Sequence, residues 1–209
     1  MFDPRHVITA TEDLRRLVSP PRPAQQTKVL SELDKHCRNW IERSPFVVVS
    51  SVDSDGKMDL SPKGDPPGFV QILDDKTLAI PDRPGNRRLD TLHNVLEQPQ
   101  VGLMFVVPGR GEVLRVAGTA RVVTDPDLLS LMEVGGRLPL LALVVNIDEV
   151  MFHCGKSIIR SQLWSQQAWP NIEGLASYAE CLGDQTTSDE TVPEMEARFN
   201  SWNDGNELY

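Results

Sequence analysis

The chain has 209 residues, 40% hydrophobic and 24% charged, which suits one sizeable folded domain with extensions. Its net charge of -9 argues against a general nucleic-acid-binding protein, because such proteins need a basic surface. No apolar run approaches the ~20 residues that a membrane-spanning helix requires, and the N-terminus lacks the apolar core of a signal peptide. Three widely spaced cysteines, Cys37, Cys154 and Cys181, form neither a disulfide framework nor a metal motif. We therefore expect free thiols and a cytoplasmic location.

Residues 1–44 are predicted to form a helical extension. A short helix is expected over Thr11–Val18, and a rigid proline-rich linker follows at 19–23. A longer helix is predicted over Thr27–Arg43, because apolar residues recur along it with helical spacing and polar residues lie opposite. The apolar stripe consists of Val29, Leu30, Leu33, Cys37, Trp40 and Ile41.

Residues 45–165 are predicted to form the main domain, in which short strand patterns alternate with turns. The strand stretches are 46–52, 58–60, 69–73, 77–80, 101–107, 112–123 and 140–147, the last of which extends towards residue 154. Turns at this spacing favour an antiparallel barrel or sandwich over a parallel βαβ sheet. Gly118 interrupts an alternating strand, which predicts a bulge or a close approach of two backbones.

Helices are expected at three places within this domain. They cover roughly 87–97, the stretch from Thr124-Asp125-Pro126 to Gly135-Gly136, and 157–164. Residues 166–209 are predicted to be a C-terminal extension. From Thr186 onward the composition is acidic and polar, which indicates a mobile or swapped tail.

A basic loop follows the strand at 77–80 and is the first candidate site. Arg83, Arg87 and Arg88 lie within six residues, around a Pro-Gly turn and next to the start of a predicted helix. Backbone N–H groups of a turn, a helix N-terminus and guanidinium groups together bind phosphate. The alternative is a connecting loop with solvated arginines. The local positive charge, in a chain of net charge -9, favours the phosphate site.

The order of motifs from Met58 to Phe105 resembles the pyridoxamine 5'-phosphate oxidase-like family of FMN-binding split barrels. The matching elements are Asp59-Leu60-Ser61-Pro62-Lys63-Gly64, the turn Gly85-Asn86-Arg87-Arg88, a helix closing at Gln98-Pro99-Gln100-Val101, and the strand Gly102-Leu103-Met104-Phe105. Together with Cys-Gly-Lys-Ser at 154–157 and Arg160-Ser161-Gln162-Leu163-Trp164, the similarity covers about 45–165. Within the family, the chain resembles a bacterial branch of probable FMN-dependent enzymes.

This resemblance implies a mainly β fold with flanking helices, namely a six-stranded antiparallel split β-barrel of the FMN-binding type. It implies a homodimer with FMN in a groove between the two protomers. Arg87 and Arg88 are then expected to hold the 5'-phosphate, with Asn86 in the place of a hydroxyl residue. Met58 stands where the family usually has an arginine, and Arg83 is the candidate to replace that ligand.

The remaining implied contacts concern the flavin ring, the ribityl chain and the partner subunit. They comprise a strand along the isoalloxazine (Leu60, Ser61, Pro62, Lys63), two residues beside the ribityl chain (Pro81, Asp82) and two from the partner (Arg160, Trp164). Lys63 is expected to favour flavin reduction by placing positive charge near N1 and O2. A solvated hairpin lysine is the alternative. No residue is assigned a catalytic role.

Two other sites receive less support. Cys154, with Lys156 nearby, is predicted to be a buried structural thiol rather than a reactive nucleophile. The four histidines show no metal-ligand spacing, so no metal is expected.

Three functions are compatible with the sequence. The first is an FMN-dependent oxidoreductase of unknown substrate that transfers hydride, with NAD(P)H as a possible electron donor. The second is a non-catalytic flavin- or haem-binding protein on the same barrel. The third is an F420-dependent reductase, for which Arg110, Arg115 and Arg121 would supply a groove for the longer cofactor tail.

Overall fold

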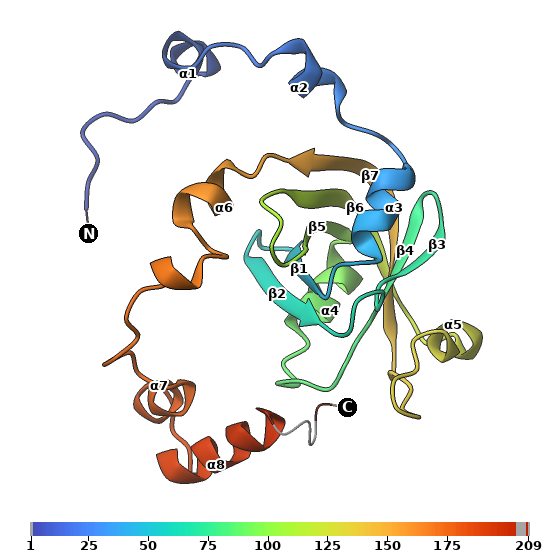
Figure 1. Cartoon of the computed structure of the whole chain (residues 1–209), viewed down its shortest axis with the longest axis vertical. Coiled ribbons are helices and arrows are strands. Elements are labelled where there is room, and N and C mark those ends of the chain that lie inside the picture. The colour runs from blue at the N-terminus through green and yellow to red at the C-terminus, as the bar shows by residue number, and fades with distance from the viewer. Residues whose placement is uncertain (1, 204–207, 209) are drawn as a thin grey trace.

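All seven stretches with a strand pattern form strands of one antiparallel sheet in the computed structural model, which describes residues 2–203 and 208 (Figure 1). The strands are β1 (Phe46–Val52), β2 (Met58–Gly64), β3 (Gln71–Asp74), β4 (Thr77–Pro81), β5 (Gln100–Val106), β6 (Val113–Val123) and β7 (Ala142–His153). Their order in the sheet is β2-β1-β5-β6-β7-β4-β3. The predicted mainly β antiparallel fold is confirmed.

The predicted strand number and closure are wrong. The sheet has seven strands rather than six, and it is open, with β2 and β3 at its edges. The additional strand is β3, which pairs with β4 across a tight turn where the Asp74 carboxylate accepts from the N–H of Lys76 at 2.7 Å. On the other edge, Pro62 lies within β2 and has no N–H to donate, which restricts this strand to an edge.

The sheet curls around a hydrophobic core made of the alternate residues on its inner face. Val47, Val49, Leu103, Phe105 and Leu114 are all buried there. Helix α3 (Lys35–Ile41) packs on this core through Cys37 and Ile41, and α4 (Asp90–Glu97) through Leu92 and Val95.

A close contact between β6 and β7 confirms the interpretation of Gly118. The register between the two strands shifts between Ala117 and Gly118, which is a bulge. A side chain at Gly118 would overlap the backbone carbonyl of Asn146 on β7. Both features that the mid-strand glycine predicted are therefore present.

The long helix predicted over 27–43 is wrong in extent. Only α3 and the five-residue α2 (Pro23–Thr27) are helical in this region. The side chain of Asp34 accepts from the N–H groups of His36 and Cys37 and so caps α3 at its first turn. Before the cap, Leu30 exchanges two backbone hydrogen bonds with Val150 of β7, which keeps the chain extended.

Three of the other helices, α1, α5 and α6, are shorter than predicted, and the helical segments after residue 165 were not predicted. They are α1 (Thr11–Leu17), α5 (Pro126–Ser130), α6 (Lys156–Ser161), the 3₁₀ turn η1 (Gln166–Ala168), α7 (Tyr178–Gln185) and α8 (Val192–Asn203). The segment from Thr186 contains one of these helices, α8, which packs on α7 and buries Met195. Figure 1 shows α1, α2, α7 and α8 lying away from the sheet.

The division into 1–44, 45–165 and 166–209 stays a prediction, and its two termini, Met1 and Tyr209, lie outside the described residues together with 204–207. Within the described part of the chain, no helix has the length and apolarity needed to span a membrane.

We predict that Gly118→Ala destabilises the protein by about 3 kcal/mol, because the backbones of β6 and β7 must separate to admit a methyl group. Chemical denaturation measures the effect. Gly85→Ala is the control, since a side chain there has only an ordinary contact at 3.9 Å from the Arg83 carbonyl oxygen. Equal stability of the two variants would contradict the close approach.

Candidate functional site

The edge strand β2 directs the predicted flavin-contacting residues to two sides of the sheet. Ser61 and Lys63 are half-buried and pair with Val49 and Val47, whose side chains point into the core. Leu60 and Pro62 alternate with them and are exposed on the outer face. The predicted strand contact with the isoalloxazine therefore has an inner polar pair and an outer apolar pair.

Two adjacent ion pairs tie the end of β2 to the loop after β4. Lys63 Nζ donates to Asp82 Oδ1 at 3.0 Å, and both side chains are 21% exposed. Arg83 Nε donates to Asp65 Oδ2 at 2.6 Å, with 13% of the Arg83 side chain and 1% of the Asp65 side chain exposed. Arg83 also donates to the carbonyl of Met132, which follows α5. Three segments distant in sequence thus meet at one corner.

The predicted phosphate loop follows this corner directly. Asn86 Oδ1 accepts from the backbone N–H of Arg88 at 3.0 Å, which forms a tight Asx turn. Arg87 and Leu89 both have φ of 60°, a left-handed conformation that non-glycine residues seldom adopt. Because of these two residues, α4 begins at Asp90 rather than at Arg87, and the arginine pair lies in the loop before the helix.

The two arginines of the loop differ in their electrostatic environment. Arg88 donates to both oxygens of the Asp90 carboxylate, at 2.7 and 3.2 Å, and these hydrogen bonds raise the pKa of its guanidinium. Arg87 is exposed and forms no hydrogen bond or ion pair within residues 2–203 and 208. Arg87 is therefore the cation of this loop that is available to a ligand, while Arg88 must share its charge with Asp90.

Helix α4 holds the loop at a fixed position against the sheet. The Thr91 hydroxyl donates to Asp59 on β2 at 2.7 Å, and the buried Asn94 amide donates to the Ser51 hydroxyl on β1 at 3.0 Å. The sequence prediction did not include these residues or Asp65. The one available signal was the acid that ends Ser61-Pro62-Lys63-Gly64-Asp65, two residues after the predicted lysine.

The two arginines of the loop have the charge and geometry that a phosphate group requires. Arg87 and Arg88 are the anion-binding groups, the backbone N–H of Arg88 being already bonded to Asn86 Oδ1, and Lys63 and Ser61 lie on the inner side of β2. Pro81 is buried as the last residue of β4, and Asp82 follows it. Lys63, Pro81, Asp82 and Arg83 are therefore brought together, and their roles towards a cofactor stay predictions.

Arg160 and Trp164 lie elsewhere in the chain. Arg160 is exposed on α6, and the Trp164 indole donates to the carbonyl of Arg110 at 2.7 Å. Figure 1 shows α6 well separated from α4. A hollow of about 430 Å³ lies between the β5–β6 turn and this segment. Its lining residues are Gly109, Gly111, Ile158, Ile159, Gln162, Trp164, Ser165 and Gln167. One copy of the chain thus does not join Arg160 and Trp164 to the phosphate loop.

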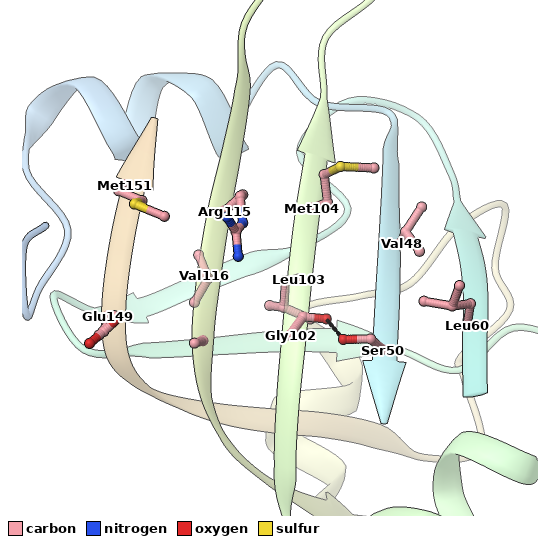
Figure 2. Close-up of a pocket in the computed structure, with 11 residues that line it drawn as sticks. Val48, Ser50, Leu60, Gly102, Leu103, Met104, Arg115, Val116, Glu149 and Met151 are labelled. Atoms are coloured by element: carbon pink, nitrogen blue, oxygen red, sulfur yellow. Dashed lines mark hydrogen bonds between the residues drawn. The ribbon is translucent and has the colours of Figure 1, made fainter. Parts of the chain in front are cut away.

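A second hollow, of about 240 Å³, lies on the outer face of the sheet (Figure 2). Its centre is low because small residues from three neighbouring strands lie side by side there, namely Ser50, Gly102 and Ala117. The Ser50 hydroxyl donates to the carbonyl of Gly102 at 3.2 Å. The remaining lining residues are Val48, Leu60, Leu103, Met104, Arg115, Val116, Glu149 and Met151.

The cysteines show one error in the sequence prediction. Cys154 is exposed rather than buried, because it follows the last residue of β7. Cys37 is the buried thiol, and burial raises its pKa to about 12, which keeps it protonated. Within the described residues, no group of three or more His, Cys, Asp or Glu side chains is arranged to hold a metal ion.

Comparison with known families gives a match over most of the sheet. Residues 33–154, more than half of the chain, match the family described as "Pyridoxamine 5'-phosphate oxidase". A comparison with curated proteins finds no match.

Similar solved structures include a putative pyridoxamine 5'-phosphate oxidase from Lactobacillus delbrueckii, 22% identical, covering 58% of this chain and 95% of that chain at a TM-score of 0.46. An FMN-binding protein from Syntrophomonas wolfei is 13% identical, with coverage of 55% and 86% and a TM-score of 0.42. HutZ, the haem storage protein from Vibrio cholerae, is 13% identical, with coverage of 58% and 94% and a TM-score of 0.43.

We predict that Asp65→Asn destabilises the protein by about 3 kcal/mol, because it replaces the buried carboxylate that Arg83 Nε contacts at 2.6 Å by a neutral amide. Denaturant titration checks this. Asp90→Asn is the matched control: the Arg88–Asp90 pair is exposed, and its loss is expected to cost less than about 1 kcal/mol. If Asp65→Asn is as stable as the control, the buried pair does not hold the corner together.

Proposed function

The chain belongs to the pyridoxamine 5'-phosphate oxidase family, and we propose that it is an FMN-dependent oxidoreductase whose flavin lies between two copies of the chain. The observation that supports this proposal most directly is the exposed Arg87, held in a left-handed turn beside β2. An exposed guanidinium without a carboxylate partner among the described residues, near an edge strand, suits a cofactor that has a phosphate.

The phosphate end of the proposed site rests on the loop from Asn86 to Arg88. Arg87 approaches the phosphate directly, since no carboxylate competes for it within the described residues. Arg88 contributes once its exposed contact with Asp90 is exchanged for the phosphate, which costs little because exposed ion pairs are weak. Arg83 has a structural role instead, since its guanidinium donates hydrogen bonds to the Asp65 carboxylate and to the Met132 carbonyl at the base of the loop.

The ring end of the proposed site lies along β2. When bound, FMN supplies the capacity to accept and return a hydride. Lys63 places a positive charge at this end, and Asp82 fixes its position at 3.0 Å. Leu60 and Pro62 offer apolar contacts on the outer side of the same strand.

A homodimer completes the proposed site. Arg160 and Trp164 are separated from α4 within one copy, so their predicted contribution to the cofactor requires a second copy. NAD(P)H is the proposed electron donor, and the substrate class is left unassigned.

The F420 alternative receives less support from the arrangement of its three arginines. Arg110 pairs with Glu112 at 3.3 Å and lies over the Trp40 ring, so it is not directed to a groove shared with the others. Arg115 lies in the hollow on the outer face. A compact pocket for one phosphate therefore agrees better with FMN. The alternative, a flavin- or haem-binding protein without turnover, is distinguished from the oxidoreductase by the nicotinamide oxidation assay below.

We predict that Arg87→Ala/Arg88→Ala lowers the affinity for FMN at least ~100-fold, because two charge-assisted contacts to the phosphate are lost while the fold is unchanged. Fluorescence titration of the apoprotein with FMN measures the affinity. Arg15→Ala/Arg16→Ala is the matched control, since it removes another adjacent, exposed arginine pair, one member of which also bonds a nearby aspartate. Equal affinity in both variants would place the phosphate elsewhere.

We also predict that the flavin-loaded protein oxidises NADH or NADPH in the presence of a dye as electron acceptor. The rate, followed by nicotinamide absorbance, is expected to fall with flavin content in Arg87→Ala/Arg88→Ala. A fully loaded protein that oxidises neither nucleotide would support the binding protein without turnover.

A further inference from the structure

We propose that Asp59 on β2 is a specificity-determining residue of the site, and that its carboxylate accepts hydrogen bonds from hydroxyl groups on the chain between the phosphate and the ring of the cofactor. The inference rests on the proposed function and deepens it. It assigns the site to a ligand whose connecting chain is hydroxylated, as the ribityl chain of FMN is. A bare anion, or a second phosphate group next to Asp59, is disfavoured by the same carboxylate.

The charges around the corner set Asp59 apart from the other carboxylates there. Four carboxylates border the ion-paired corner and the phosphate loop, and three of them pair with a cation. These pairs are Asp65–Arg83, Asp82–Lys63 and Asp90–Arg88. Asp59 is the fourth, and it forms no ion pair within residues 2–203 and 208. Its charge is therefore not part of the ion pairs that hold the corner together.

Asp59 begins a row of polar side chains on the inner side of β2. Side chains alternate along a strand, so Asp59, Ser61 and Lys63 lie on the same side, and all three are half-buried. Lys63 is about 13 Å further along the strand than Asp59, at ~3.3 Å per residue. With the phosphate at one end of this row and the ring at Lys63, Asp59 and Ser61 lie beside the chain that connects the two.

Asp59 is at the end of the row that adjoins the phosphate loop. The Thr91 hydroxyl on α4 donates to Asp59 Oδ2 at 2.7 Å, and Figure 1 shows α4 next to β2. The pKa of the Arg88 guanidinium is raised mainly by its hydrogen bonds with Asp90, and the nearby charge of Asp59 adds to this effect. Asp59 therefore acts at the position that the phosphate group would share with Arg88.

One oxygen of the Asp59 carboxylate is left for a ligand. Oδ2 accepts from Thr91, whereas Oδ1 has no hydrogen-bond partner within the described part of the chain. A carboxylate only accepts hydrogen bonds, so a donor satisfies Oδ1 and a phosphate oxygen does not. The hydroxyl groups of a ribityl chain are donors of this kind.

A purely structural role does not account for a carboxylate at this position. The hydrogen bond from Thr91 requires only an acceptor, which the amide of an asparagine would supply without a charge. A negative charge beside Arg87 and Arg88 repels any phosphate that binds there. Donation from ligand hydroxyl groups offsets this cost, because hydrogen bonds to charged groups are the stronger ones. The carboxylate thus favours a hydroxylated ligand over a bare anion.

The test compares two ligands that differ only in their hydroxyl groups. One is FMN, and the other is a flavin phosphate whose chain carries no hydroxyl group. Their dissociation constants are measured by fluorescence titration of the flavin-free, full-length protein. Because both carry the same phosphate, its repulsion by Asp59 cancels in the ratio of the two constants. Wild type is expected to favour FMN, and Asp59→Asn is expected to reduce this preference about 10-fold, since a neutral hydrogen bond replaces a charge-assisted one.

A third ligand separates the effect of charge from damage to the loop. Sulfate resembles phosphate but has no hydroxyl group, so Asp59 only repels it. Asp59→Asn is therefore expected to bind sulfate about fivefold more tightly than wild type does. Competition against FMN at constant ionic strength measures this affinity. Damage to the loop would weaken the binding of sulfate and of FMN alike, so tighter sulfate binding together with a smaller preference for FMN identifies the carboxylate.

Glu97→Gln is the matched control. Glu97 also lies on α4 and accepts from a hydroxyl group, that of Ser54 at 2.9 Å, but it is exposed at the other end of the helix. Its replacement should leave the flavin ratio and the sulfate affinity within about twofold of wild type, because an exposed charge at that distance is largely screened. Thermal unfolding verifies that both variants are folded.

The possible outcomes separate this inference from the proposed function. A wild type that binds FMN and its hydroxyl-free analogue equally well would overturn the inference and leave the flavin site in place. An unchanged ratio in Asp59→Asn, or weaker sulfate binding by that variant, would do the same. A wild type that binds neither flavin would overturn the proposed function, and the inference with it.

Discussion

The two ion pairs at the end of β2 determine where every part of the candidate site lies. An open sheet does not by itself fix the distance between its edge strand β2 and the loop after β4, a strand near the opposite edge. Lys63–Asp82 and Asp65–Arg83 fix it, and the second pair is the more deeply buried of the two. The turn that contains Arg87 lies next to β2. Helix α4, which follows it, is held to the sheet by hydrogen bonds of Thr91 with Asp59 and of Asn94 with Ser51.

The edge strand β2 and the second copy of the proposed homodimer both take part in the proposed cofactor site. Residues of β2 alternate between the corner that holds Lys63 and the outer face that exposes Leu60. In the proposed homodimer the second copy is needed to bring Arg160 and Trp164 to the phosphate loop, from which they are separated within one copy.

Local patterns in the sequence predicted the strands well, because alternation and turn residues report on each strand separately. Gly118 is the clearest case, since a glycine within an alternating strand usually marks a bulge or a close backbone contact. The helix over 27–43 failed because its apolar stripe could not reveal that Leu30 pairs with Val150, a residue far along the chain. For the same reason the resemblance could name Lys63, Asp82 and Arg83 but not the ion pairs that they form. The Pro-Gly turn was visible in the sequence, but the left-handed φ of Arg87 was not, because the residue there is not a glycine.

The measurement that tests the central claim most directly is the absorbance spectrum of the purified protein, combined with the mass of the small molecule that heat releases. We expect flavin absorbance bands and a released mass equal to that of FMN, which has the single phosphate that the loop at Arg87 suits. A deazaflavin spectrum with a longer cofactor would contradict the compact phosphate site. A colourless protein that takes up no added FMN would contradict the proposed flavin site altogether.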